Sequence, residues 1–139
     1  MRELSLKTVV FPRDMWAGGH NAFGGWIMGQ MDIAASVRIQ SFLTSGALTI
    51  TVSNMHFKKP VHVGDIVNVY TDVTAIGNTS ITMKIDVEVV SHATNTEHCV
   101  TEAEFKFVAV DENGSPISVA DVVRGNVKDK DILKLLNEK

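Results

Sequence analysis

The sequence predicts an α+β fold in which one curved antiparallel sheet wraps around a long central helix, with a short helix near the C-terminus. Two observations support this prediction. The segment from Phe23 to about Thr44 is apolar on every face of a helix, and a helix that is apolar all round is buried. The strand-like segments that follow alternate apolar and polar residues, as antiparallel strands do when only one face of their sheet is buried. Because the sheet must cover the helix, wrapping is the compact solution.

Length and composition define the broad class of protein. The 139 residues are 45% hydrophobic and 21% charged, with a net charge of −3 and a pI near 5.9, so we expect one domain over residues 1–139 and no nucleic-acid partner. No apolar run approaches the ~20 residues that a membrane helix needs, and the start at Met1 lacks the apolar core of a signal peptide. Cys99 is the only cysteine. We therefore expect a cytoplasmic protein with no membrane partner and no internal disulfide.

The other elements follow from local patterns. A first strand is expected near Leu4–Val10, and the long helix stops before Ser45-Gly46. In the strand after the helix, the apolar positions change from even to odd numbers, which predicts a β-bulge near Ser53-Asn54. The predicted strands after the helix and the short final helix span about 48–59, 66–76, 81–89, 103–109 and 129–137.

Two charged side chains, Asp32 and Arg38, stand in the otherwise apolar helix. At 100° per residue they are separated by about 240° around the helix, so they do not face each other. Arg38 is long enough to extend towards an edge of the helix, whereas Asp32 is short. A buried, unpaired carboxylate costs several kcal/mol. Asp32 therefore either faces a solvent channel or a backbone group, or serves as a catalytic base or nucleophile.

Gly24 and Gly25 stand at the predicted start of the same helix. Free backbone N–H groups and the positive end of the helix dipole favour a developing oxyanion there. Gly24 precedes Asp32 by eight residues, which is ~12 Å along a helix axis. One helix cannot bring both groups to one carbonyl, but two antiparallel copies could. The sequence therefore predicts a composite site at a two-fold interface.

Four segments together resemble a known family: GGWIMGQMDIA, FKKPVHVGD, GNTSITMKIDVEV and TEAEFKFVAVDENGSP. They are similar, in this order and over roughly residues 11–116, to the hotdog-fold acyl-CoA thioesterases, in particular the bacterial YciA-type hydrolases. The resemblance implies a sheet wrapped around a helix, hydrolysis of acyl-CoA without a metal or bound cofactor, and homodimers that assemble into a hexamer. It also implies that Asp32 is the catalytic aspartate and that the Gly24 N–H, beside Gly25, polarises the thioester carbonyl.

The chain departs from the family pattern at one position. Family members carry an asparagine seven residues before the first glycine of the pair, where this chain has Ala17. The resemblance therefore leaves open which residue orients the water or the thioester. Asn21 and His20 are the candidates, and a loop residue without a catalytic role is the alternative.

Further candidates follow from the resemblance. Lys58 and Lys59 precede Pro60 at the family's CoA entrance, so they are candidates for the CoA phosphates, with solvated protection of a strand edge as the alternative. Ser80 occupies a family position near the pantetheine or phosphate of CoA and could equally be a turn hydroxyl. Thr49, Thr51 and Ser53 are expected to share one strand face, either near the site or in ordinary sheet packing. The histidines show no metal-ligand spacing.

Two other functions remain open from the sequence. A hotdog hydratase or dehydratase would use His20 and Asp32 as an acid–base pair, although the residues after His20 differ from the pattern of those enzymes. A non-catalytic acyl-CoA-binding module would bind CoA without releasing a thiol.

Overall fold

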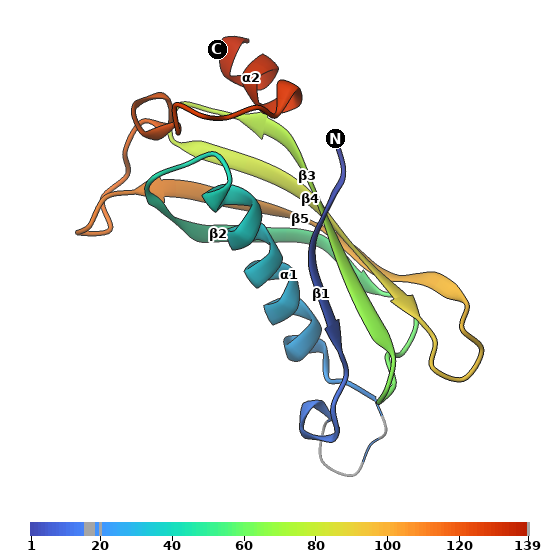
Figure 1. Ribbon diagram of the computed structural model, residues 1–139. Coiled ribbons are helices and arrows are strands. Elements are labelled where there is room, and N and C mark those ends of the chain that lie inside the picture. The colour runs from blue at the N-terminus through green and yellow to red at the C-terminus, as the bar shows by residue number, and fades with distance from the viewer. Residues whose placement is uncertain (16–18, 20, 139) are drawn as a thin grey trace.

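The structure is a computed structural model that describes residues 1–15, 19 and 21–138. Within these residues the chain forms five strands, two α-helices and two short 3-10 helices (Figure 1). In chain order they are β1 (Glu3–Val9), η1 (Pro12–Asp14), α1 (Gly24–Gln40), β2 (Gly46–Phe57), β3 (Ile66–Ile76), β4 (Ser80–Val90), β5 (Glu97–Val110), η2 (Val119–Val122) and α2 (Lys130–Asn137). The predicted order of long helix, strands and short helix is confirmed.

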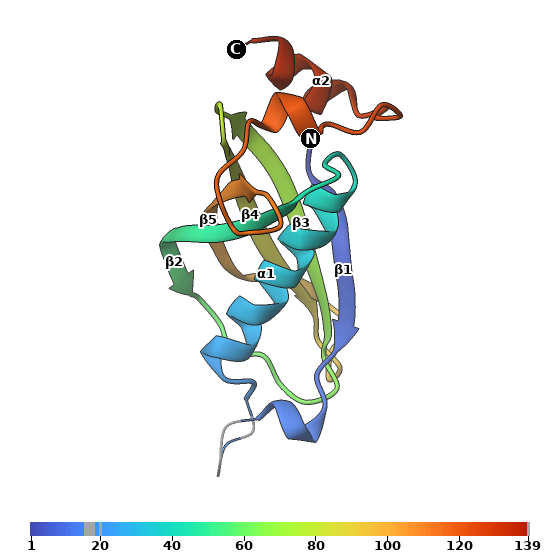
Figure 2. The ribbon, with the colours of Figure 1, turned by 90° about the vertical axis from the view of Figure 1, so that its left-hand side faces the viewer.

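The five strands form one antiparallel sheet with the order β1-β3-β4-β5-β2. The sheet curves around α1, which crosses its concave face (Figures 1 and 2). Helix α1 contacts β1, β2, β3 and β4. The predicted α+β architecture, a curved sheet around one long helix, is therefore confirmed.

The core lies between α1 and the concave face of the sheet. The alternation predicted for the third strand after the helix region is seen in β4, where the buried side chains are Ile81, Met83, Ile85, Val87 and Val89. From α1, the apolar side chains buried against the sheet are Ile27, Met31, Ala34, Ala35 and Ile39. They recur at three- and four-residue intervals, so they form one face of the helix.

The rest of the α1 surface is exposed in the single chain, and the prediction of a helix buried on every side is wrong for one copy. Met28, Ile33 and Val37 expose 38%, 51% and 50% of their surface. Leu48 and Ile50 of the neighbouring edge strand β2 are also exposed. An apolar helix face beside an edge strand is typical of a surface that another chain covers. The sequence pattern indicates that the helix is buried, but not which chain buries it.

The predicted β-bulge in β2 is confirmed. The pairing of β2 with β5 shifts register between Ser53 and His56. Asn54, inside this shift, has a φ of 56°, a left-handed conformation that asparagine tolerates better than most residues.

A second irregularity in β2, between Thr49 and Thr51, was not predicted. Ile50 is the extra residue, and it changes which side chains face α1. Thr49 pairs with the buried Phe107 and therefore faces the helix, whereas Thr51 pairs with the exposed Lys106 on the outer face. The expectation that Thr49 shares a strand face with Thr51 and the following serine is wrong, because the bulge reverses the alternation.

Helix α1 ends at Gln40, earlier than the predicted end near Thr44. Phe42 and Leu43 follow the helix and are fully buried, and Leu43 forms an isolated β-bridge with Val123. The chain leaves the helix because this route buries both side chains against the segment after β5.

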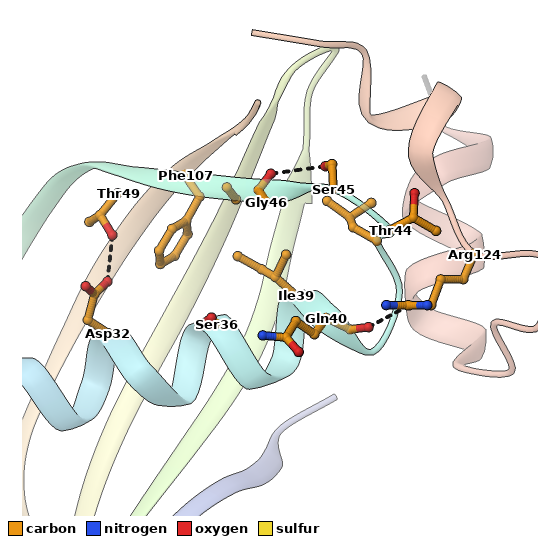
Figure 3. A pocket seen from close by; sticks show the side chains of 12 residues that line it. Asp32, Ser36, Ile39, Gln40, Thr44, Ser45, Gly46, Thr49, Phe107 and Arg124 are labelled. Atoms are coloured by element: carbon orange, nitrogen blue, oxygen red, sulfur yellow. Dashed lines mark hydrogen bonds between the residues drawn. The ribbon is translucent and has the colours of Figure 1, made fainter. Parts of the chain in front are cut away.

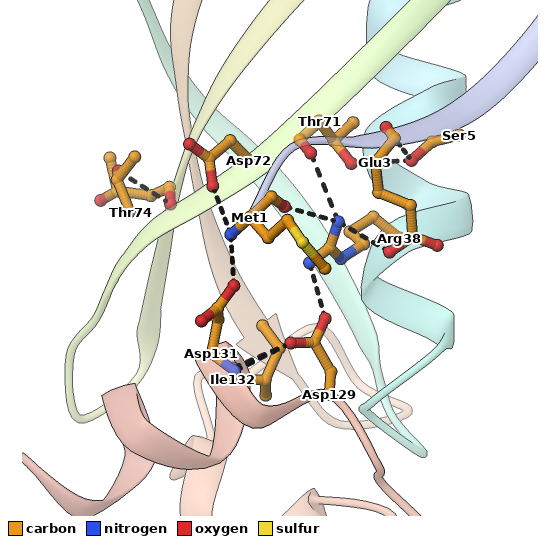
Figure 4. Close-up of polar contacts among 11 residues, drawn as sticks. Met1, Glu3, Ser5, Arg38, Thr71, Asp72, Thr74, Asp129, Asp131 and Ile132 are labelled. Atoms are coloured by element: carbon orange, nitrogen blue, oxygen red, sulfur yellow. Dashed lines mark hydrogen bonds and ion pairs between the residues drawn. The ribbon is translucent and has the colours of Figure 1, made fainter.

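Arg38 is buried, which corrects the expectation that it extends to an edge of the helix. Only 2% of the residue is exposed. Its terminal nitrogens form 2.8 Å ion pairs with Glu3 of β1 and with Asp129 before α2, and Nη1 donates to the carbonyl of Thr71 (Figure 4). Two carboxylates therefore compensate the buried charge, and Asp32, as expected from its angle on the helix, is not among the partners.

The predicted C-terminal helix is α2, and Asp129 is its N-cap. The Asp129 carboxylate accepts hydrogen bonds from the backbone N–H groups of Asp131 and Ile132, as N-cap residues do. Ile132 is buried in the core. None of the helices in the described part of the chain is long and apolar enough to span a bilayer.

Candidate functional site

Asp32 lies on the exposed face of α1 and points towards β2. The hydroxyl of Thr49 donates a 2.6 Å hydrogen bond to Asp32 Oδ1 (Figure 3). This contact depends on the unpredicted bulge at Ile50, because the bulge turns Thr49 towards the helix. Asp32 is therefore exposed in the single chain, hydrogen-bonded to a fixed strand, and free of a basic partner within ion-pair distance among the described residues.

Two hollows adjoin Asp32 and Thr49. One, of about 450 Å³, runs along α1 towards its C-terminal end and is lined mainly by Asp32, Ser36, Gln40, Gly46, Phe107 and Arg124 (Figure 3). The other, of about 250 Å³, runs towards the start of the helix and is lined by Gly25, Met28, Gly29, Asp32, Thr49, Val52 and Phe105. Asp32 thus stands between two spaces, one polar and one with mainly apolar walls.

The start of α1 has backbone N–H groups without a partner among the described residues. Phe23, the N-cap residue, has an extended backbone with a ψ of 153° and provides no side-chain cap. Neither Gly24 nor Gly25 donates a backbone hydrogen bond to any residue that the structure describes. A Cβ on Gly24 would lie 3.2 Å from the ring of Phe57, which shows how closely β2 approaches this end of the helix.

Four of the predicted site residues meet in one pocket at this end. Asn21, Gly24, Lys58 and Lys59 line a hollow of about 430 Å³, with Phe57 as part of its wall. Asn21 is held there by an isolated bridge to His62. His20 lies outside the described residues, as does the loop at 16–18, which contains Ala17 and departs from the family pattern.

Lys58 has a partner within the chain. Its Nζ lies 3.1 Å from Glu102 Oε1, and both side chains are exposed. This hydrogen bond raises the pKa of Lys58 and lowers the pKa of Glu102. A phosphate would compete with Glu102 for this ammonium group, whereas Lys59 has no ion-pair partner in the described part of the chain.

Ser80 lies far from the two lysines within one chain. It starts β4 and pairs with Val108, near the end of β5 that pairs with Gly46 at the start of β2. Lys58 follows Phe57, which ends β2 at the other end of the sheet. A joint role of Ser80 with Lys58 in CoA binding stays a prediction that requires more than one copy of the chain.

Gly24 and Asp32 open into different pockets. Gly24 and the two lysines line the 430 Å³ pocket at the start of α1, and the two hollows beside Asp32 contain neither Gly24 nor the lysines. With ~12 Å of helix between them, a single chain does not bring the Gly24 N–H and the Asp32 carboxylate to one carbonyl group.

Side chains suited to metal binding are dispersed. Among the residues that the structure describes, no three of His, Cys, Asp and Glu come together in a metal-binding arrangement.

Comparison with known proteins identifies the family. The family model described as the thioesterase superfamily matches residues 19–95. The acyl-CoA thioester hydrolase YciA of Escherichia coli is 38% identical over 117 residues, which cover 82% of this chain and 88% of that protein.

Two solved structures are similar throughout the fold. HI0827, a hexameric broad-specificity acyl-coenzyme A thioesterase, superposes with a TM-score of 0.83 at 36% identity, over 96% of this chain and 88% of that one. The hexameric thioesterase y2039 from Yersinia pestis superposes with a TM-score of 0.78 at 39% identity, over 84% and 94%. The chain therefore belongs to the thioesterase superfamily, as a hotdog-fold relative of the YciA acyl-CoA thioester hydrolases.

Proposed function

We propose that the protein hydrolyses acyl-CoA thioesters, releasing CoA and a free acid, at a site shared by two copies of the chain. Asp32 of one copy and the backbone N–H of Gly24 of the other would act on the same thioester. The family supports the reaction, since its YciA relatives are named acyl-CoA thioester hydrolases.

The observation that carries the shared site is the position of Asp32. It lies beside the exposed Met28 on one flank of α1, and Ile33 and Val37 are exposed farther round the helix. A second copy that covers Met28 and Asp32 would shield the Asp32 carboxylate from bulk solvent and leave its hydrogen bond to Thr49 intact. The same contact would bring the Gly24 N–H of the second copy to the thioester carbonyl beside Asp32, which the chain's own Gly24 does not reach.

The proposed reaction uses Asp32, the Gly24 N–H and water, and requires no metal or bound cofactor. The Gly24 N–H hydrogen-bonds to the thioester carbonyl oxygen and stabilises the oxyanion that forms on it. In the general-base route, Asp32 takes a proton from water as the water oxygen attacks the carbonyl carbon. The C–S bond then breaks, and the CoA thiolate receives the proton. In the nucleophilic route, Asp32 attacks the carbon itself and the C–S bond breaks to release the CoA thiolate. Water then hydrolyses the resulting mixed anhydride, which frees the acid, restores the Asp32 carboxylate and supplies the proton that the thiolate takes up.

The remaining site residues have supporting roles in this proposal. Asn21, in the Gly24 pocket, would orient the thioester or the water, with His20 as the alternative. Lys59, and Lys58 in exchange for its contact with Glu102, would bind CoA phosphates at the rim of the same pocket. Gly25 would assist Gly24, and Ser80 would contact CoA bound to a neighbouring copy.

We further propose that the dimers assemble into a hexamer in the cytoplasm. Two of the similar solved structures are of hexameric thioesterases. A reducing compartment suits a chain whose single cysteine, Cys99, has no partner for an internal disulfide. Residues 1–139 would then act as one domain in each of six copies.

The test measures thiol release from a panel of acyl-CoA thioesters. Asp32→Asn should lower kcat by orders of magnitude and leave the circular dichroism spectrum and oligomeric mass unchanged. Gly24→Pro should be similarly inactive, because proline has no backbone N–H. The helix should still form, because proline is well tolerated at the first position of a helix. The extended backbone of Phe23 is also the conformation that precedes proline.

Gly24→Ala is the matched control. It adds the same Cβ beside Phe57 but keeps the N–H, so it should retain far more activity than Gly24→Pro. If Asp32→Asn hydrolyses acyl-CoA as fast as the parent, or if tight CoA binding occurs with no thiol release, the proposed function is wrong.

Mixing the two inactive variants tests whether the site is shared. In random mixing, half of the dimers contain one chain of each kind, and each has one intact pair of Asp32 and Gly24. Co-refolding Asp32→Asn with Gly24→Pro in equal amounts should therefore restore about a quarter of the parental activity. If the mixture recovers no hydrolytic activity, both functional groups belong to one chain and the composite site is refuted.

A further inference from the structure

We infer that Arg124 selects acyl groups that end in a carboxylate, so that the preferred substrates are CoA half-thioesters of dicarboxylic acids. This inference rests on the proposed function, because it takes the hydrolytic centre to be at Asp32. It assigns a specificity-determining residue to the 450 Å³ hollow that begins at Asp32 and ends at Arg124 (Figure 3).

The hollow follows a polar stripe along α1. Asp32, Ser36 and Gln40 recur every four residues on one flank of the helix, so they form one wall. Ile39, Leu43 and Phe107 contribute apolar surface, and the loop and strand from Thr44 to Thr49 form the opposite side. An aliphatic tail would cover these polar groups without hydrogen-bonding to them, which is unfavourable.

Arg124 is held at the far end of this hollow. Its Nε donates a 2.8 Å hydrogen bond to the carbonyl of Gln40, at the end of α1. Its backbone N–H donates to the carbonyl of Phe42 at 2.9 Å. The second contact fixes the backbone and the first fixes the side chain beside the hollow, and neither uses the terminal nitrogens.

The charge of Arg124 is uncompensated in the described part of the chain. No carboxylate among the described residues lies within ion-pair distance of it, and its Nη atoms have no hydrogen-bond partner there. Arg2 and Arg38, in contrast, pair with carboxylates. A guanidinium with two free nitrogens is suited to a carboxylate, which it binds through two parallel hydrogen bonds.

The geometry places that carboxylate on the acyl group. From Asp32 to Gln40 the helix rises ~12 Å, and the reacting carbonyl must be at the Asp32 end. The group that reaches Arg124 is therefore the far end of the acyl chain. The hollow thus offers a polar path from the reacting carbon to a cation.

The experiment compares kcat/KM for adipoyl-CoA and hexanoyl-CoA, which have equal chain lengths and differ in a terminal carboxylate or methyl group. The parent should prefer adipoyl-CoA. Arg124→Met should lower the adipoyl-to-hexanoyl ratio roughly five- to tenfold, the range expected for a charge-assisted hydrogen bond open to solvent. Arg124→Lys should give an intermediate ratio, because it keeps the charge but loses the paired donors.

Lys106→Met is the control for loss of one positive charge, since Lys106 lies on the outer face of β5, and it should leave the ratio unchanged. The parental ratio should also fall as ionic strength rises, which requires no variant. An unchanged ratio in Arg124→Met, an equal loss on both substrates, or a changed oligomeric mass would refute this inference, because the residue would then only support the end of α1. Failure of the parent to hydrolyse either thioester would instead refute the proposed function.

Discussion

We predict that the hydrogen bond from Thr49 positions the Asp32 carboxylate for catalysis. Thr49→Val removes the hydroxyl and replaces it with a methyl group of similar size. The donor lies on β2 and the acceptor on α1, so the bond fixes the carboxylate relative to the sheet. We expect the variant to fold and assemble as the parent does, and to lose catalytic rate because Asp32 samples other rotamers.

The magnitude follows from the contact. At 2.6 Å, the O–H···O⁻ distance is that of a charge-assisted hydrogen bond, which contributes about 1.5–3 kcal/mol when it is kept from solvent. If the whole contribution is made in the transition state, kcat falls about ten- to hundredfold. Asp32 is exposed in the single chain, so the upper part of this range applies only where a second copy covers the site.

The assay is steady-state thiol release, with kcat and KM determined separately. Thr49→Ser keeps the hydroxyl and should recover most of the rate, and Thr49→Val should change KM less than kcat. In the Asp32→Asn background, Thr49→Val should have little further effect, because the group it positions is already disabled. The positioning role is refuted if Thr49→Val keeps half or more of the parental kcat, or if Thr49→Ser is impaired equally.

Two further predictions concern charged groups that the fold buries. Arg38→Met should lower the free energy of unfolding by about 1–2 kcal/mol, because Glu3 and Asp129 lose their shared cation but remain partly exposed to water; urea denaturation at equal protein concentration would measure this, and a change within 0.5 kcal/mol would contradict it. Asp86 Oδ1 is buried without a hydrogen-bond partner, and burial raises the pKa of this carboxyl. Its charged form therefore destabilises the folded state above the ordinary carboxyl pKa. Asp86→Asn should raise Tm at neutral pH, and the gain should disappear in acid, where Asp86 is protonated in both states; a lower Tm at neutral pH would contradict this.

The sequence predicted the elements whose cause is local. The alternation in β4 depends on one face of the strand being buried, and the structure buries Ile81 through Val89 at every second position. The short final helix predicted over about 129–137 is likewise a local feature, and the structure shows that Asp129 caps it. The β-bulge at Asn54 was predictable because the apolar positions there change parity.

Features that depend on distant residues were not predictable. Arg38 is buried because Glu3 and Asp129 reach it from opposite ends of the chain, and no pattern around Arg38 indicates either partner. The bulge at Ile50 is hidden in the sequence because Leu48, Ile50 and Val52 alternate perfectly. The structure nevertheless places Leu48 and Val52 on different faces, through their pairing with Val108 and Phe105.

The candidate site shows the same division. Asp32 could be found from the sequence because a charge in an apolar helix needs an explanation. The sequence did not identify Thr49 as its partner, since that contact depends on the bulge. Arg124 gave no signal, because its place beside Gln40 results from the chain returning past the end of α1.

The shared site also determines how two copies of α1 must meet. Gly24, Met28 and Asp32 follow one another at four-residue intervals along one side of the helix. If Gly24 of each copy lies opposite Asp32 of the other, the helices run antiparallel and the two-fold axis passes beside the residue midway between them, which is Met28. Met28 is 38% exposed in the single chain, and it lines the smaller hollow next to Asp32. A flexible, apolar side chain at the axis would pack against its own copy and close the space between the two reaction centres. The exposed apolar face of α1 and the separation of Gly24 from Asp32 would then have one cause, a site that exists only where two chains meet.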